Sequence, residues 1–350
     1  MVGIPCAISV FEYTRKRTNA NKAIISSFFL VFLLLLVFRS QNVGLDMPSY
    51  YWMYNTAGRE SWKRIFTQYD EFGYYSFSKL IYLVFGDFQW LVVITSLASL
   101  VPIWFLYRNN IDNHMFLAIV IFLNIGLFSI YFSAIRQVIA MAFVVPAYYF
   151  TKKKKLILFL LMIVPAFLFH KSAFIIVLMY PVYHIRIKWY QMLIISALLI
   201  PLCIIFRSQL FTFFSNLFSS IYETREITLT NAISIFLLLV IFLVFSFVIP
   251  DNSLVDDETK GLRNLLILCC MLQVFSGVDT LVMRMNYYFL LFVPITITRV
   301  IDYTSLKNKK LTEVALLAML VFFTAFYFIS AFSGPGSLHI YPYQAFWNVS

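Results

Sequence analysis

Residues 24–38 read IISSFFLVFLLLLVF, and Arg39 follows at once. An uncharged, mostly apolar run of about 17 to 25 residues crosses the hydrocarbon core of a bilayer as a helix. Similar runs lie near 88–107, 115–132, 133–150, 189–206, 232–249, 285–301 and 311–332, and shorter ones at 156–169, 172–183 and 264–278. The sequence therefore predicts an all-α, polytopic membrane bundle of about 11 transmembrane helices (10–12).

The composition supports a membrane protein. Of the 350 residues, 61% are hydrophobic and 12% are charged, and the mean hydropathy is +0.83. Soluble chains carry about 25% charged residues, so this chain has too few charges to cover a surface in water. A soluble enzyme, a nucleic-acid-binding domain and a disordered scaffold are excluded. The net charge of +11 does not indicate nucleic acid, because Lys and Arg lie mostly in short gaps between apolar runs.

The positions of the basic residues predict an orientation. If residues 12–23 are cytoplasmic, alternation puts 108–114, 151–155, 184–188, 250–263 and 302–310 on the same side, and these segments hold most of the Lys and Arg. We therefore expect one membrane-embedded domain, 1–350, with an aromatic and acidic outer-face loop at 39–87. A second outer-face loop is expected at 207–231, and a short hairpin with its tip at residues 170–171.

Basic residues outside the cytoplasmic loops need another explanation. Arg136 begins a helix and has no acidic neighbour in the sequence, so it needs a distant partner or an anionic ligand. A phosphate would suit both the cation and the helix N-terminus, although a plain interfacial cap fits too. Arg284 has Tyr287 and Tyr288 on its helical face, and it either faces a ligand or pairs with an acidic residue such as Asp279 or Asp46.

The predicted tip of the hairpin carries His170 beside Lys171. A lone histidine is usually structural, but this one could donate to a phosphate or transfer a proton. No zinc-ligand spacing is visible, so no metal site and no cofactor are predicted. The four cysteines, Cys6, Cys203, Cys269 and Cys270, are interpreted as apolar packing residues.

The outer-face loop begins with Arg39 and Asp46. Asp46, Tyr50 and Tyr54 share one face if the stretch after Pro48 is helical. They could bind a ligand, or form an interfacial aromatic belt with Arg39 reaching the headgroups. Tyrosines beside carboxylates also suit sugar binding, because rings stack on sugar faces and carboxylates accept hydroxyl hydrogens. A membrane-surface segment has the same composition.

These pieces together resemble the EpsG/Wzy-type polysaccharide polymerases, which are multispanning bacterial membrane proteins. The resemblance lies in the order of the pieces over nearly the whole chain. They are Glu12-Tyr13, Arg39, Gly44-Leu45-Asp46 with Tyr50 and Tyr54, Glu71-Phe72-Gly73-Tyr74, Arg136-Gln137 with Ala140, Phe169-His170-Lys171-Ser172-Ala173, Arg284 with Tyr287-Tyr288, and Pro342-Tyr343.

The resemblance implies an enzyme that joins oligosaccharide repeat units carried on undecaprenyl diphosphate. The reaction would occur at the outer face of the bacterial cytoplasmic membrane and yield O-antigen, capsule or exopolysaccharide. It leaves open a chain-length regulator protein as a partner. The catalytic candidates are Arg136, Arg284, His170 and Asp46. The substrate-binding candidates are Arg39, Tyr50, Tyr54, Glu71, Tyr74, Gln137, Lys171, Tyr287 and Tyr288.

Preorganised guanidinium groups would stabilise the charge that develops on a diphosphate leaving group, and His170, Asp46 or Glu71 could act as the base. Three alternatives stay open. A lipid-linked oligosaccharide flippase or transporter would also need buried cations and many helices. An O-antigen ligase-like glycosyltransferase shares the substrate and the arginine chemistry. A membrane-bound acyltransferase would depend on a histidine deep in the membrane.

Overall fold

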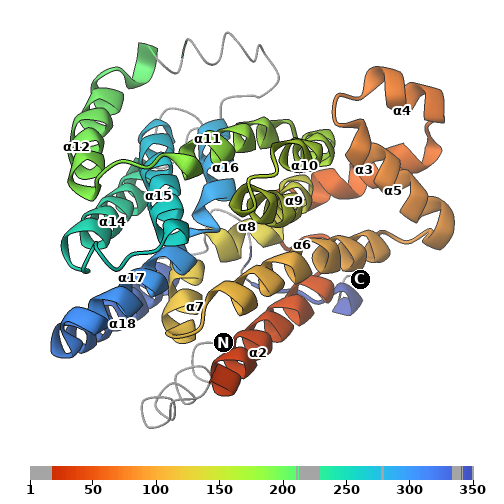
Figure 1. The fold of residues 1–350 in the computed structure, drawn as a ribbon. Coiled ribbons are helices and arrows are strands. Elements are labelled where there is room, and N and C mark those ends of the chain that lie inside the picture. The colour runs from red at the N-terminus through yellow and green to blue at the C-terminus, as the bar shows by residue number, and fades with distance from the viewer. Residues whose placement is uncertain are drawn as a thin grey trace. The chain divides into compact units, whose positions relative to one another are not determined.

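The structure is a computed structural model that describes residues 18–209, 212, 229–276, 280–332, 340 and 342–348. Within these ranges the regular structure is helical, and one isolated antiparallel bridge joins Arg39 to Ala345. The all-α polytopic class is confirmed. The helices, labelled as in Figure 1, are α2 (Thr18–Val37), α3 (Met47–Arg59), α4 (Trp62–Gln68), α5 (Phe72–Phe85), α6 (Phe88–Asn110), α7 (Met115–Asn124), α8 (Leu127–Ser133), α9 (Ile135–Lys152), α10 (Leu156–Phe169), η1 (Lys171–Leu178), α11 (Met179–His184), α12 (Trp189–Ile205), α14 (Leu229–Val248), α15 (Asp257–Phe275), α16 (Thr280–Leu290), α17 (Val293–Lys307), α18 (Lys309–Phe332) and η2 (Phe346–Asn348).

Every predicted span coincides with a helix or a pair of helices, but several are broken. The run 115–132 forms α7 and α8, bent by 55° where Gly126 adopts a left-handed φ of 85°. The run 285–301 is split into α16 and α17, bent by 41°, because Pro294 starts a new helix. The run 172–183 is a 3-10 helix followed by the short α11. Backbone breaks of this kind leave the apolar pattern intact.

Length and composition single out fewer spans than the predicted eleven. Among the described helices, 2 are long and apolar enough to cross a membrane alone, α6 and the Lys309–Phe328 part of α18. The count rises to 4 if each bent pair is one span, and four more apolar helices, in α2, α10, α12 and α14, are shorter.

The chain folds into two compact units. The first comprises Met1–Phe174 and Ala318–Ser350, and the second Ile175–Leu317. In the first unit α2 packs along α6 (Figure 1), α6 packs on α9, and α9 on α10. Helix α5 connects α3 to this group, because it packs against both α3 and α10. In the second unit α15 is central and contacts α11, α12, α14, α16 and α17.

Polar contacts in each unit bring together loops that alternation places on one side of the membrane. In the first unit Asn21 Nδ2 donates to Asp112 O at 2.7 Å, and Lys152 Nζ lies 3.5 Å from Asn110 Oδ1. These contacts join three of the predicted cytoplasmic segments.

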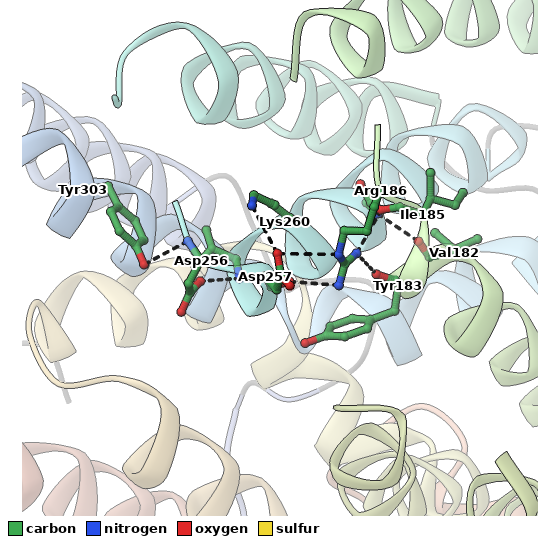
Figure 2. A network of polar contacts seen from close by, with 10 residues as sticks. Val182, Tyr183, Ile185, Arg186, Asp256, Asp257, Lys260 and Tyr303 are labelled. Atoms are coloured by element: carbon green, nitrogen blue, oxygen red, sulfur yellow. Dashed lines mark hydrogen bonds and ion pairs between the residues drawn. The ribbon is translucent and has the colours of Figure 1, made fainter. Parts of the chain in front are cut away.

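Figure 2 shows the equivalent network in the second unit. Arg186 Nη2 donates to Asp257 O at 3.1 Å, and Lys260 Nζ lies 3.1 Å from Asp257 Oδ1. The backbone N–H of Asp256 donates to the Tyr303 hydroxyl oxygen at 3.2 Å. The segments 184–188, 250–263 and 302–310 therefore meet at one end of this unit.

Residues 39–87 form a folded excursion made of α3, α4 and α5. Pro48 stands in the first turn of α3, so the stretch after it is helical, and Tyr50 and Tyr54 are both buried. Their rings belong to a core that includes Met47, Ile65 and Tyr74. The excursion thus shares a packed core with α6 and α9. It ends at Gly86, where a left-handed φ of 74° closes α5 just before α6 begins.

Candidate functional site

The carboxylate of Glu71 is the centre of a polar cluster in the first unit. Glu71 occupies the N-cap position of α5 and is 4% exposed. Arg136 Nη1 donates to its Oε2. His170 Nδ1 lies 2.8 Å from its Oε1, and the backbone N–H of Lys171 donates to the same oxygen at 3.0 Å. Three separate parts of the chain therefore converge on one carboxylate.

Helix ends and one glycine bring these residues together. His170 ends α10 with an extended backbone, which turns its side chain out of the helix. The start of α5 lies against the last turn of α10 at Gly73. A Cβ at Gly73 would lie 2.8 Å from Leu168 Cβ and from Leu168 O. The absence of a side chain at Gly73 thus lets Glu71 reach His170.

Glu71 is ionised in this environment. Burial alone would raise its pKa, but the hydrogen bond and charge of His170, the charge of Arg136 and the Lys171 backbone N–H lower it to about 2. An ionised carboxylate only accepts hydrogen bonds. The contact with His170 therefore requires the proton on Nδ1, and the lone pair of a neutral imidazole then lies on Nε2.

Arg136 is the cation of the cluster, in the first turn of α9. Its guanidinium carbon lies 5.6 Å from the centroid of the Tyr50 ring and 6.0 Å from that of Tyr74. Its side chain is 23% exposed, whereas those of Glu71 and His170 are 5% and 1% exposed. Its Nε has no hydrogen-bond partner among the described residues. Glu71 and Tyr50 each engage part of the guanidinium, and an anion would have to bind its partly exposed remainder.

A second ion pair lies next to the cluster. Lys171 Nζ is 2.9 Å from Asp70 Oδ2, and these side chains are 23% and 65% exposed. Consecutive acidic residues, Asp70 and Glu71, thus engage consecutive basic residues, His170 and Lys171. Sequence reasoning did not select Asp70. The sequence carried one signal for it: the acidic neighbours Asp70 and Glu71 precede two basic neighbours by about 100 residues in the chain.

Other predicted residues of this unit have structural contacts. Arg39 is 1% exposed, and its Nη1 donates to Tyr131 O at 2.8 Å, in the last turn of α8. The Tyr54 hydroxyl donates to Asp87 O at 3.1 Å. Asp46 is the N-cap residue of α3, and its backbone N–H donates to Ser133 Oγ at 3.2 Å.

The loop before Asp46 packs tightly against the chain just before α9. Gly44 has a φ of 114°, and a Cβ there would lie 2.0 Å from Phe132 O. Gln137 follows Arg136 on α9 and is 1% exposed. Arg39 and Tyr54 support the fold beside the cluster, while Tyr50 and Tyr74 line it.

The remaining candidates lie in the second unit or outside the described residues. Helix α16 carries Arg284, which is half-buried, and Tyr287 and Tyr288, which are buried. The meeting of Arg284 and Arg136 in one site stays a prediction. The Glu12-Tyr13 pair, Asp279 and most of the 207–231 loop lie outside the described residues. Within the described ranges, no group of three or more His, Cys, Asp or Glu could hold a metal ion.

Comparison with protein families matches residues 22–345 to the EpsG family. No curated protein and no solved structure matches the chain significantly. The family match covers nearly the whole chain and includes the Glu71 cluster, the excursion and α16. Such membership indicates a polysaccharide-polymerase-type function with a glycosyltransferase-like reaction. The match shows that this chain, a multi-pass membrane protein of apolar helices, belongs to the EpsG family.

Proposed function

We propose that this protein elongates a polysaccharide by transferring a growing chain from its lipid diphosphate to a hydroxyl of the next lipid-linked repeat unit. The observation that carries the proposal is the cluster in which Glu71 holds both Arg136 and His170. It supplies a cation for a phosphate and an oriented imidazole for a hydroxyl proton. Family membership supports the class of reaction.

The proposed step balances as a displacement at the anomeric carbon. The acceptor hydroxyl oxygen forms a bond to that carbon, and the bond from the carbon to the diphosphate oxygen breaks. The electron pair of the broken bond leaves with the lipid diphosphate, and the hydroxyl proton goes to His170 Nε2. The products are a chain longer by one unit, still on the acceptor's lipid, and a free lipid diphosphate.

We propose that Arg136 stabilises the leaving diphosphate, because charge develops on the diphosphate oxygens as the bond breaks. A guanidinium can present two N–H donors to a phosphate at once, which an ammonium cannot do in the same geometry. We propose that Arg284 supplies a second guanidinium for the diphosphate and that Tyr287 and Tyr288 contact the substrate beside it. Asp46 stays an alternative base to His170.

Glu71 is assigned a positioning role instead of substrate binding. Both of its oxygens already accept protein hydrogen bonds, and its low pKa makes it a poor base. It fixes the imidazole with Nδ1 protonated and orients the guanidinium. Lys171, held by Asp70, remains a candidate for headgroup or phosphate contacts.

The reaction is proposed to occur at the outer face of the cytoplasmic membrane. The basic loops indicate that the opposite end of the first unit, around Asp112 and Lys152, is cytoplasmic. Glu71, Arg136 and His170 all lie at helix ends, as expected for chemistry at a membrane surface. A transporter would instead need its charged site near the midplane.

The test uses purified protein in liposomes with a defined lipid-linked repeat unit, and gel analysis of product length. Arg136→Ala should abolish long products, and Arg136→Lys should restore only part of the activity. Arg64→Ala is the matched control and should retain full activity, because Arg64 is an exposed residue of α4 whose ion-pair partner is Glu60 at the end of α3. Normal product length from stably expressed Arg136→Ala would refute the role. Transfer of finished polymer to another acceptor, without elongation, would indicate a ligase.

A further inference from the structure

Helix α5 has an unusual distribution of charge. Its single charged residue, Lys79, is 6% exposed. Lys79 Nζ donates to Gly58 O at 3.1 Å and to Glu60 O at 2.7 Å, at the end of α3. It also lies 5.4 Å from the centroid of the Trp62 ring. The helix thus turns its only charge inward, onto backbone carbonyls that α3 leaves unsatisfied.

A neighbouring face of α5 is apolar and uncovered. Its exposed residues, Leu80, Leu83, Val84 and Phe85, are 53%, 60%, 71% and 44% exposed. Leu80, Leu83 and Val84 are spaced three and four residues apart, so they share one face. A helix in water buries its apolar stripe and exposes its charges, and this half of α5 does the reverse.

This face continues onto a membrane span. The Phe85 ring stacks on the Trp90 ring, with centroids 4.7 Å apart and planes at 22°. Trp90 lies in the first turn of α6, a candidate span, and is 46% exposed. Farther along α6, Leu97 and Val101 are exposed as well. A tryptophan at the end of a span typically marks the membrane interface.

We propose that the C-terminal half of α5 is immersed in the bilayer, where its partner is the acyl chains of the leaflet that borders this end of the first unit. The excursion 39–87 is then part of the membrane-embedded body instead of a loop in water. The exposed polar residues of α4, Lys63, Arg64 and Thr67, are then expected to face water and headgroups. The proposal does not depend on the polymerase activity.

The immersion has a consequence for the polar cluster. Glu71 stands at the other end of α5, about 20 Å along the helix axis from Val84 at 1.5 Å per residue. One helix therefore connects the leaflet interior to the cluster. A substrate anchored in that leaflet could reach the cluster by lateral diffusion.

The test measures the depth of nitroxide labels on the full chain in liposomes of phosphatidylethanolamine and phosphatidylglycerol. Single cysteines are introduced as Val84→Cys, Thr67→Cys on α4 as the water-facing control, and Leu97→Cys on α6 as the lipid-facing control. The native cysteines Cys6, Cys203, Cys269 and Cys270 are replaced by Ala. Power saturation then compares collision with dissolved oxygen and with a water-soluble nickel chelate.

The proposal expects the label at position 84 to behave like that at 97, with oxygen collisions dominant, and the label at 67 to show the reverse. A membrane-impermeant maleimide should also react at least about tenfold more slowly with Cys at 84 than at 67, because the thiolate needs water. Nickel accessibility at 84 equal to that at 67 would overturn the proposal. Exclusion of both reagents would also overturn it, and would indicate coverage by protein, such as a second copy of the chain.

Discussion

The substitution Glu71→Gln removes one negative charge from the centre of the cluster and keeps the shape of the side chain. In the folded chain the pKa of Glu71 is lowered from 4.5 to about 2, which corresponds to about 3 kcal/mol in favour of the ionised form at about 1.4 kcal/mol per unit of pKa. Loss of one partner from a buried ion pair costs about 3 to 5 kcal/mol, so two independent arguments agree. We therefore expect Glu71→Gln to destabilise the fold by about 3 kcal/mol.

The assay is thermal unfolding of the purified protein in detergent at neutral pH. A loss of about 3 kcal/mol should lower the Tm by about 6 to 12 °C at about 2 to 4 °C per kcal/mol. Glu60→Gln is the matched control, since Glu60 lies in the same excursion but makes a pair with the exposed Arg64. That control should lose less than about 1 kcal/mol. Equal Tm values for the two variants would show that the charge of Glu71 does not stabilise the fold.

Three further predictions follow from the same contacts. The pKa of Glu71 is lowered in the folded state, so its contribution to the free energy of unfolding is present above pH 4.5 and is lost as the pH falls towards 2. The Tm difference between wild type and Glu71→Gln should therefore shrink over that range, and a constant difference would contradict this linkage. His170→Gln should lower kcat with little change in KM, measured as initial rates on a defined lipid-linked unit; a pure KM effect would make His170 a binding residue. Gly73→Ala should cost about 1 to 3 kcal/mol in unfolding measurements, because the new Cβ meets Leu168 at 2.8 Å; an unchanged Tm would show that α5 and α10 can separate freely.

The positions of the helices could be predicted from the sequence, because only segments that satisfy their own backbone hydrogen bonds can cross lipid, and long apolar runs mark them. The breaks within them could not. The bend at Gly126 and the restart at Pro294 depend on single backbone conformations inside runs that stay apolar throughout. Helix α15 begins at Asp257, before the predicted apolar run at 264–278. It begins there because the side chain of Asp256 accepts the Thr259 N–H, which places charged residues in the first turn.

The need of Arg136 for a distant partner was predictable, but the partner's identity was not. Glu71 lies 65 residues away in the sequence, and its other partner, His170, lies 99 residues away. Such pairings depend on how α5, α9 and α10 pack, which apolar periodicity does not specify. The excursion was predicted as an outer-face aromatic and acidic loop. Tyr50, Tyr54 and Tyr74 fill a core that the excursion shares with α6 and α9, and α5 keeps an exposed apolar face while its Lys79 points inward.

We propose that the cluster around Glu71 serves transfer from a lipid diphosphate to a sugar hydroxyl. The most direct measurement is mass spectrometry of one reaction cycle, with purified wild-type protein and a single defined lipid-linked repeat unit in liposomes. We expect equal amounts of a lipid-linked dimer and free lipid diphosphate, and neither product with Arg136→Ala. Recovery of the intact unit, merely moved across the bilayer, would contradict it.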